Sequence, residues 1–279
     1  MKTVSKLFLH PGGVGLDGPE PGGQILDVEG LSVKDDKGLI AIKNVSFSIC
    51  KGEILGIAGV SGNGQKELEE TLVGLRKTFE GKIFVKGRDV TNKSTREILS
   101  AGVGLIPEDR IGKGIAGTLS VAENLILGAH TYSPFAHRGS LPFDNKWFID
   151  KRSSDEYADR LIKEFDIRTP SREAPALTLS GGNLQKLILA REISRNPDIL
   201  IVSQPTRGLD VAATEFIRKR LLRQKEQGTA ILLISEDLNE IISLSDRVAV
   251  IYRGEILGII PSDQVDVKEI GLMMAGVKR

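Results

Sequence analysis

The chain has 279 residues, of which 40% are hydrophobic and 27% are charged, so it is long enough to bury a core and is not disordered in composition. Its 38 Lys and Arg residues nearly balance its 37 acidic residues, which gives no electrostatic reason to expect nucleic acid or an anionic membrane surface as a partner. No apolar run approaches the roughly 20 residues that a membrane helix needs. The bulk numbers therefore favour a folded chain without a membrane span.

The N-terminal segment, residues 1–24, is predicted to be a flexible linker, because Pro and Gly dominate it from Pro11 to Gly23. Ordered structure is expected from Ile25 onward. The single cysteine, Cys50, cannot form an intrachain disulfide, which fits a reducing compartment. Its position in an alternating apolar run predicts a packing role.

Short apolar segments predict the first strands of the fold. Alternation places Val45, Phe47 and Ile49 on one face of an expected strand, and the uninterrupted apolar run 54–58 is typical of a buried parallel strand. A glycine-rich turn follows, after which helical periodicity predicts a helix from Gln65 onward. The apolar face of that helix is expected to contain Leu68, Leu72 and Leu75.

The second half of the chain repeats this alternation of strand and helix. Two apolar strands are expected at residues 199–202 and 230–234, with a helix over about 213–227 between them, which predicts a parallel βαβ unit. Residues from about 108 to 176 break the alternation and are predicted to form a smaller, mostly helical subdomain. The chain from 25 to 279 is thus expected to be one α/β domain.

The glycine-rich turn has the spacing of a phosphate-binding loop, G-x-x-x-x-G-K-[ST], between a strand and a helix. In such a loop, backbone N–H groups and the helix N-terminus hold the phosphates of a nucleotide. The candidate nucleotide-binding residues are Gly59, Gly62, Asn63, Gly64, Gln65 and Lys66.

Two side chains that handle charge in a phosphate-binding loop are exchanged here. Gln65 occupies the lysine position, and Lys66 occupies the position of the hydroxyl that ligates Mg²⁺. Lys66 could reach the phosphates instead, but a shift of one residue turns a side chain by about 100° around a helix. Loss of a charge-assisted hydrogen bond costs about 1.5 to 3 kcal/mol, so weak nucleotide binding could survive and tight binding should not.

A second motif begins at Leu179-Ser180-Gly181-Gly182-Asn183 and continues as Leu184-Gln185-Lys186, at an expected helix start. The apolar strand after it leads into Ser203-Gln204-Pro205-Thr206-Arg207 and then Gly208-Leu209-Asp210. In this order the segments closely resemble the signature, Walker B strand and D-loop of ATP-binding-cassette (ABC) transporter ATPases. Together with Ile106-Pro107-Glu108-Asp109-Arg110, they resemble the second cassette of tandem ATPases that serve simple-sugar and nucleoside importers.

The resemblance covers residues 25–279 and implies a P-loop ABC cassette: a mainly parallel core sheet, an antiparallel β subdomain and a helical subdomain. It also assigns chemical positions. The Walker B aspartate corresponds to Ser203, the glutamate that polarises water to Gln204, the switch histidine to Glu236 and the γ-phosphate-sensing glutamine to Glu108. No aromatic residue for stacking a base lies between Leu31 and Val45. Hydrolysis at the chain's own loop is therefore predicted to be deficient, with no metal ligand of its own.

In this family the signature of one cassette completes the ATP site of another. The intact signature predicts that the chain completes the ATP and Mg²⁺ site of a second cassette with intact Walker motifs. The resemblance further implies permease subunits, an external substrate-binding protein and a place at the cytoplasmic face of the membrane. Two alternatives stay open: a soluble ABC protein of the ribosome or DNA-repair type, and an inactive truncated product. The sequence does not identify the transported substrate.

Overall fold

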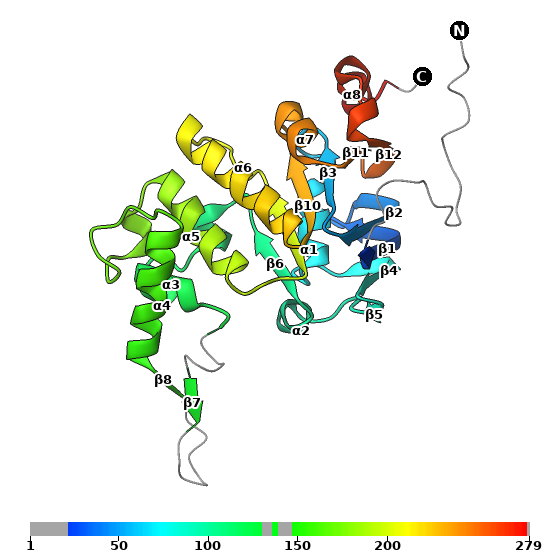
Figure 1. Cartoon of the computed structure of the whole chain (residues 1–279). Coiled ribbons are helices and arrows are strands. Elements are labelled where there is room, and N and C mark those ends of the chain that lie inside the picture. The colour runs from blue at the N-terminus through cyan, green and yellow to red at the C-terminus, as the bar shows by residue number, and fades with distance from the viewer. Residues whose placement is uncertain (1–21, 130–135, 139–146, 278–279) are drawn as a thin grey trace. The chain divides into compact units, whose positions relative to one another are not determined.

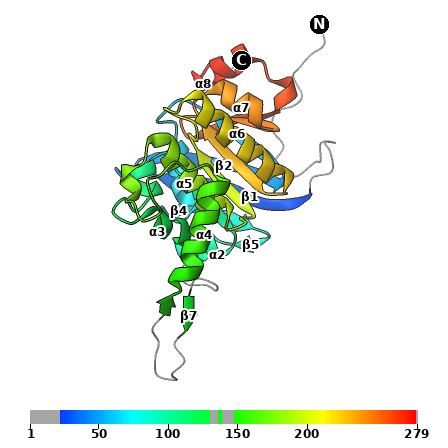
Figure 2. The ribbon, with the colours of Figure 1, turned by 60° about the vertical axis from the view of Figure 1, so that its left-hand side comes forward.

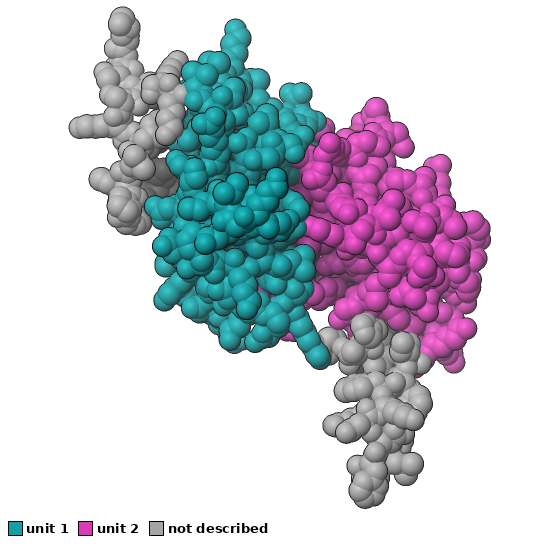
Figure 3. Space-filling view, turned by 180° about the vertical axis from the view of Figure 1, so that it is seen from behind, with its two compact units in different colours: residues 1–97, 230–279 teal, residues 98–229 magenta. Residues whose placement is uncertain are grey.

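The computed structural model describes residues 22–129, 136–138 and 147–277, which divide into two compact units (Figure 3). Unit 1 contains Met1–Glu97 and Ala230–Arg279, and unit 2 contains Ile98–Thr229. The predicted linker, residues 1–24, lies outside the described residues except for its last three positions.

Unit 1 contains strands of two sheets and the helices that pack on them (Figure 1). One sheet is four-stranded and antiparallel, in the order β2-β1-β4-β5. In the other, the order is β12-β11-β3-β10: β3 runs parallel to β10 and β11, and β12 is antiparallel to β11. The elements are β1 (Gly22–Lys34), β2 (Ile40–Lys51), β3 (Ile54–Ala58), α1 (Gln65–Leu72), β4 (Thr78–Val85), β5 (Arg88–Asp89), β10 (Ala230–Ser235), α7 (Leu238–Leu244), β11 (Arg247–Tyr252), β12 (Glu255–Pro261), a 3-10 turn (Ser262–Gln264) and α8 (Val267–Met274).

The alternation expected around residue 47 is confirmed in β2. Val45, Phe47 and Ile49 are all buried, because alternate residues of a strand face the same side of its sheet. Cys50 points the other way and is half-buried, so it is not a member of the core as its apolar context predicted. Burial and the neighbouring Glu53 carboxylate raise the pKa of its thiol.

The predicted buried strand and the helix after it are both present in unit 1. All five residues of β3 are buried, as expected for a strand with parallel neighbours on both sides. The helix α1 begins at Gln65 as predicted, and Leu68 and Leu72 belong to its buried face. The prediction for Leu75 is wrong: α1 ends at Leu72, Gly74 adopts a positive φ, and the Leu75 side chain is 55% exposed.

Unit 2 combines a parallel strand pair, β6 and β9, with several helices (Figures 1 and 2). Helix α3 packs against both α4 and α5, and α5 also packs against β6 and α6. Helix α2 (Thr95–Ser100) crosses the boundary between the units. The remaining elements are β6 (Val103–Ile106), a π-helical turn (Arg110–Gly114), α3 (Val121–Ile126), β7 (Ala136–Arg138), β8 (Trp147–Ile149), α4 (Lys151–Glu164), a 3-10 turn (Ala176–Thr178), α5 (Gly181–Ile193), β9 (Ile199–Ser203) and α6 (Val211–Glu226).

The signature helix α5 is enclosed to an extent that periodicity did not predict. Leu184, Leu187 and Ile188 are buried as expected, but every residue from 184 to 193 is buried, including Gln185 and Lys186. The predicted subdomain of residues 108–176 falls inside unit 2, which also contains α5, β9 and α6. Among the described residues, no helix is both long and apolar enough to cross a membrane.

Candidate nucleotide-binding segments

The glycine-rich loop of unit 1 connects β3 to α1. Gly64 is the residue before the helix and has φ 104°, a conformation that favours glycine. A Cβ on Gly64 would lie 2.7 Å from the carbonyl oxygen of Ala41 and 2.6 Å from the Ile42 Cδ1. Tight packing against β2 therefore demands glycine here, independently of any nucleotide.

The Gln65 side chain folds back over the loop that precedes it. Its Oε1 accepts a hydrogen bond from the Asn63 N–H at 3.1 Å, and its Nε2 donates to the Val60 carbonyl at 3.0 Å. The Asn63 Nδ2 donates to the same carbonyl at 3.0 Å, while its Oδ1 accepts from the Arg253 N–H at 2.8 Å. A backbone N–H that a phosphate would need is thus already bonded within the loop.

The Lys66 side chain, which follows the predicted lysine position, lies beside two carboxylates. Its Nζ lies 3.9 Å from an Asp36 carboxylate oxygen and 4.0 Å from one of Glu70, and the side chain is 59% exposed. Glu70 also binds Arg76 at 2.7 Å, so Lys66 belongs to a local cluster of charges. This placement agrees with the expectation that a shift of one residue turns a side chain by about 100° around a helix.

Glu236, at the position of the switch histidine, lies at the same end of the unit 1 sheet as the loop. Ser235 of β10 pairs in register with Ala58 of β3, so Glu236 and Gly59 follow directly at the carboxyl ends of neighbouring parallel strands. The Ser235 hydroxyl bonds to the buried Glu240 carboxylate at 2.7 Å. The structure therefore brings together the loop and this predicted position.

The Walker B positions lie in unit 2 at the end of β9. Ser203 is 3% exposed, and its buried hydroxyl has no hydrogen-bond partner among the described residues. Gln204 is also buried and has φ 48°, in the left-handed region that costs a residue with a Cβ about 1 kcal/mol or more. Neither side chain carries the carboxylate that Mg²⁺ binding or water activation would need.

Glu108, at the predicted γ-phosphate-sensing position, lies just after β6, which pairs with β9 in unit 2. Its carboxylate forms an ion pair with the Arg207 guanidinium, which follows β9. The neighbouring D-loop turns at Gly208, with φ 68°, and passes through Leu209 to Asp210. The Asp210 side chain accepts from the Ala213 N–H at 2.8 Å and so caps α6.

The signature lies at the N-terminus of α5. Leu179 is buried and anchors the turn, whereas Ser180 is exposed at the capping position without a side-chain hydrogen bond to the helix backbone. The Asn183 Nδ2 donates to the Ser180 Oγ at 3.0 Å, and the Asn183 Oδ1 accepts from the Arg168 N–H at 2.9 Å. Because its oxygen accepts this bond, the Ser180 hydroxyl proton is left for donation to another acceptor. The Gly182 position leaves room only for a small contact, since a Cβ there would lie 3.4 Å from Ala213.

Sequence reasoning quoted Arg110 and Gln185 in two motifs but did not predict the contacts by which they support the signature helix. The Arg110 Nε donates to the Oε1 of the fully buried Gln185 at 2.7 Å, and the Arg110 Nη2 donates to the Arg207 carbonyl. A single sequence offers no signal for these contacts beyond the presence of Arg110 in the segment after β6, because 75 residues separate it from Gln185.

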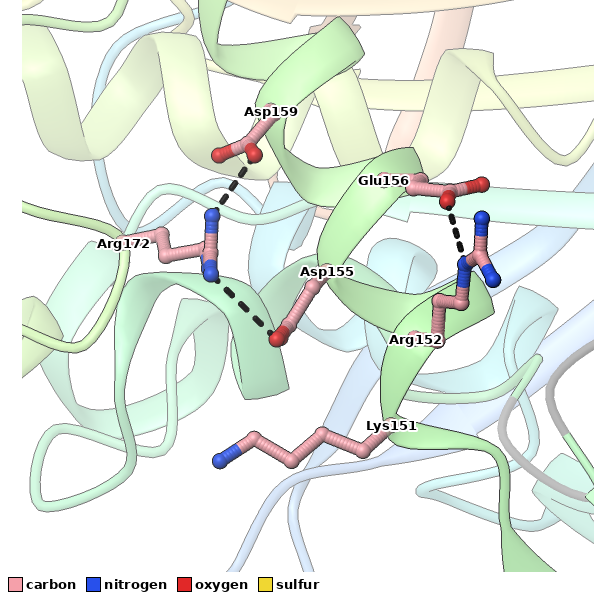
Figure 4. A pocket seen from close by; sticks show the side chains of 6 residues that line it. All are labelled: Lys151, Arg152, Asp155, Glu156, Asp159 and Arg172. Carbon is pink, nitrogen blue, oxygen red and sulfur yellow. Dashed lines mark hydrogen bonds and ion pairs between the residues drawn. The ribbon is translucent and has the colours of Figure 1, made fainter.

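A surface pocket lies beside α4 of unit 2 (Figure 4). Arg172 bonds to Asp159 at 2.6 Å and to Asp155 at 3.3 Å, and Arg152 bonds to Glu156 at 2.9 Å. These arginine and carboxylate side chains pair with one another, and the residues named for nucleotide binding are not in the lining. The lining residues are Lys151, Arg152, Asp155, Glu156, Asp159 and Arg172.

The donor groups at the loop and Walker B positions do not suit Mg²⁺. Lys66 presents an ammonium group, which cannot ligate a cation, and Ser203 presents a hydroxyl where a carboxylate would be expected. Across the described ranges, no group of three or more His, Cys, Asp or Glu side chains could hold a metal ion. The chain's own positions therefore do not fit the metal that the resemblance implied.

Comparison with known proteins shows the class to which the chain belongs. Residues 42–207, more than half of the sequence, match the family described as ABC transporter. The chain belongs to this family, and its expected fold, a P-loop ABC cassette with parallel and antiparallel sheets and helices, is confirmed. Family membership implies ATP binding by its cassettes.

The particular relatives are import ATPases. The chain is 44% identical to the guanosine import ATP-binding protein NupO of Bacillus subtilis and 42% identical to the nucleoside import ATP-binding protein NupA of Lactococcus lactis. Each match covers 92% of this chain and 49% of the relative. The ribose import ATP-binding protein RbsA of Bacillus licheniformis is 37% identical over 86% of this chain and 46% of its own length. The chain thus spans about half the length of the curated relatives it matches.

Solved structures support the same fold. The ATP-binding cassette MJ1267 of an ABC transporter aligns with a TM-score of 0.71 and 24% identity, over 91% of this chain and 96% of that one. The ATP-binding subunit of another ABC transporter aligns with a TM-score of 0.72 and 20% identity, over 90% and 99% of the two chains.

Proposed function

We propose that this chain is a cassette of an importer for nucleosides or simple sugars, and that it completes the ATP site of a partner cassette without hydrolysing ATP at its own loop. The names of the relatives support the transport class, because the matched proteins are import ATPases for guanosine, nucleosides and ribose. Its working place would be the cytoplasmic face of a membrane, on permease subunits served by an external substrate-binding protein.

The observation that carries the proposal is the internal bonding of the Gln65 side chain. By taking the Asn63 N–H and the Val60 carbonyl, it provides the loop with the partners that a phosphate and a lysine would otherwise provide. A nucleotide would have to displace these bonds without gaining a cation from Gln65. Exchange of the acid-base group at Gln204 would reduce any remaining turnover by about 10² to 10⁴.

The signature end of α5 has the opposite character. The Ser180 hydroxyl makes no capping bond to the helix backbone, and the amides of Gly181 and Gly182 begin a 13-residue helix whose partial positive charge favours a phosphate. The proposal therefore assigns residues 179–183 to an ATP that a partner's intact P-loop holds together with its Mg²⁺. When the two cassettes close around that ATP, unit 2 residues within 108–176 would transmit the movement to the permease.

The test uses this chain assembled with its permease subunits and a cassette that has an intact P-loop. Changing Ser180→Arg places a long cation where the phosphate should dock and should abolish the cooperative ATPase of the partner. Ser243→Arg, a change of equal size on the exposed surface of α7, serves as the control. Unaltered ATPase in the Ser180→Arg complex would disprove the proposal, and failure of the chain to assemble with any such partner would favour an inactive product.

A further inference from the structure

A guanidinium group lies directly beside the signature in unit 2. The Arg110 Nη1 is 3.6 Å from the position that a Cβ on Gly181, the first residue of α5, would take. The Nε and Nη2 of the same side chain are held by Gln185 and by the Arg207 carbonyl. Because a guanidinium is planar and rigid, two hydrogen bonds fix the direction of its remaining edge. That edge is therefore held next to Gly181.

The charge of Arg110 is not neutralised by a carboxylate within the part of unit 2 that the structure describes. Of the two acidic residues just before it, Glu108 forms an ion pair with Arg207, and the Asp109 carboxylate accepts from the Gly112 N–H. Burial lowers the pKa of the Arg110 guanidinium, since removing a cation from water disfavours its charged form. An arginine nevertheless stays protonated in proteins. A half-buried cation beside the positive end of a helix is an unfavourable arrangement until an anion joins it.

The same place contains more hydrogen-bond donors than acceptors. The Gln185 Nε2 is buried and has no partner among the described residues, while its Oε1 is taken by Arg110. The Ser180 Oγ accepts from Asn183, so its proton is directed elsewhere, and no side chain caps the first N–H groups of α5. A buried donor without an acceptor costs about 1 to 3 kcal/mol, and such a group in a native structure calls for an explanation. A ligand with several anionic oxygens would supply acceptors for the exposed Ser180 hydroxyl and for the first N–H groups of α5.

We infer that Arg110 is a phosphate-contacting residue: held by Gln185 and Arg207, it adds a fixed cation to the Ser180 end of α5 and binds the terminal phosphate of the ATP that a partner cassette presents. The inference rests on the proposed function, which supplies that ATP. It adds a side chain from the segment after β6 to a signature otherwise made of a serine hydroxyl and backbone amides. Gln185 acts through Arg110 as a positioning residue.

The inference is tested by ATP-driven association of this chain with a partner cassette whose hydrolysis is blocked. The measured quantity is the ATP concentration that gives half-maximal association. Arg110→Gln should raise it about tenfold to a hundredfold, the range expected for loss of a charge-assisted hydrogen bond. Arg110→Lys should raise it less, because it keeps the cation but loses the planar fork. Lys219→Gln removes a cation from an exposed site on α6 and should change nothing.

Gln185→Glu separates charge from packing. The glutamate is nearly isosteric and keeps the acceptor for the Arg110 Nε, but its negative charge neutralises the guanidinium. The inference predicts weaker ATP-driven association in this variant, whereas a purely structural role for Arg110 predicts no loss. The Gln185→Glu variant also tests the role of Arg110 if the Arg110→Gln variant fails to fold. The midpoint of thermal unfolding reports whether each variant is folded.

Two further comparisons assign each outcome. Association is also measured with ADP and inorganic phosphate in place of ATP, which shows whether a free anion satisfies Arg110. If Arg110→Gln weakened this association as much as it weakened the association with ATP, the assignment of Arg110 to the phosphate of ATP would be overturned. If Ser180→Arg blocks association while Arg110→Gln and Gln185→Glu leave it unchanged, the inference about Arg110 is wrong and the proposed function stands. If Ser180→Arg also has no effect, the proposed function itself fails.

Discussion

The N-termini of α1 and α5 differ in what bonds to the groups around them. Neither has a side-chain cap, whereas six other α-helices begin with a capping side chain, which at α2 is the Ser94 hydroxyl. At α1 the Gln65 amide turns back and bonds within the loop, while at α5 the Ser180 hydroxyl and Arg110 are left with donors to spare. The capping residues elsewhere are Ser120, Asp150, Asp210, Asp237 and Asp266.

The difference shows two ways in which the N–H groups at a helix start can be left, bonded within the protein or open to a ligand. The orphan N–H groups of a helix start can be satisfied by a ligand or by the protein itself. At α1 the Gln65 side chain bonds within the loop, and the proposed function assigns no nucleotide to it. The start of α5 has no such side chain, and we expect it to depend on an ATP from elsewhere. The predictions below separate these two conditions.

The largest expected effect is on the stability of the fold at the N-terminus of α1. Gly64→Ala should lower the free energy of unfolding by about 2–5 kcal/mol, because it combines an unfavourable positive φ with overlap against Ala41 and Ile42. Gly181→Ala at the N-terminus of α5 should change the free energy of unfolding by less than about 0.5 kcal/mol, since its Cβ would make only an ordinary contact. Urea unfolding measures both.

A control at the same loop separates strain from overlap. Gly62 also has a positive φ, but no atom lies within 4 Å of a Cβ placed there. Gly62→Ala should therefore cost only the strain, about 1 kcal/mol or somewhat more. Equal losses for Gly64→Ala and Gly181→Ala would show that the two starts are packed alike.

The next effect concerns the direction of the Ser180 proton. Asn183→Asp replaces the amide that donates to the Ser180 Oγ with a carboxylate that would accept the hydroxyl proton and repel phosphate. Partner ATPase should fall at least tenfold, while the temperature of unfolding should change little, because an acidic residue in the first turn favours the helix. An ATPase activity equal to wild type would mean that Ser180 does not donate to phosphate.

The third expected effect concerns nucleotide binding at the loop before α1. Gln65→Lys removes the amide from the loop and restores the cation of a phosphate-binding loop, so the isolated chain should bind ATP about tenfold to a hundredfold more tightly. Hydrolysis should remain slow, because Ser203 and Gln204 are unchanged. Calorimetric titration with MgATP measures the affinity, and Lys66→Ala should not weaken it in either background. Tight binding by the natural chain, lost in Lys66→Ala, would contradict the internal bonding of the loop.

The smallest effect concerns the anchoring of α5. Lys186 binds the Asp166 carboxylate at 2.6 Å, and this hydrogen bond, with the charge of Lys186, lowers the pKa of Asp166. A lowered pKa stabilises the fold above the ordinary value near 3.9 and ceases to do so as the pH falls through the folded value. Asp166→Asn should cost less than about 1 kcal/mol at pH 7, since Asp166 is 61% exposed.

The pH dependence is the control for that last prediction. Asp166 has φ 48°, which asparagine adopts readily, so Asp166→Asn isolates the charge from the backbone conformation. The difference in unfolding free energy between the two proteins should shrink as the pH drops below about 3.9. A difference that persisted at low pH would come from packing.

Much of the architecture could be predicted because burial leaves a periodic trace in the sequence. The strand before the loop, the helix start at Gln65 and the helix after Ser180 were all expected from apolar spacing and motif order. Periodicity failed at Leu75, where the helix had already ended, and at Cys50, which lies on the less buried side of its strand. Local pattern does not report where tertiary contacts stop a helix.

By itself, the sequence determined that this chain is an ABC cassette, and it predicted an intact signature with Gln65, Ser203, Gln204 and Glu236 at positions of nucleotide chemistry. Only the tertiary structure decided where those side chains turn. Gln65 bonds to its own loop, Lys66 turns to Asp36 and Glu70, and Arg110 meets Gln185 across 75 residues. The physical reason is that spacing in a sequence specifies which backbone segments are buried, whereas a hydrogen-bond partner is selected by the distances and angles that packing creates.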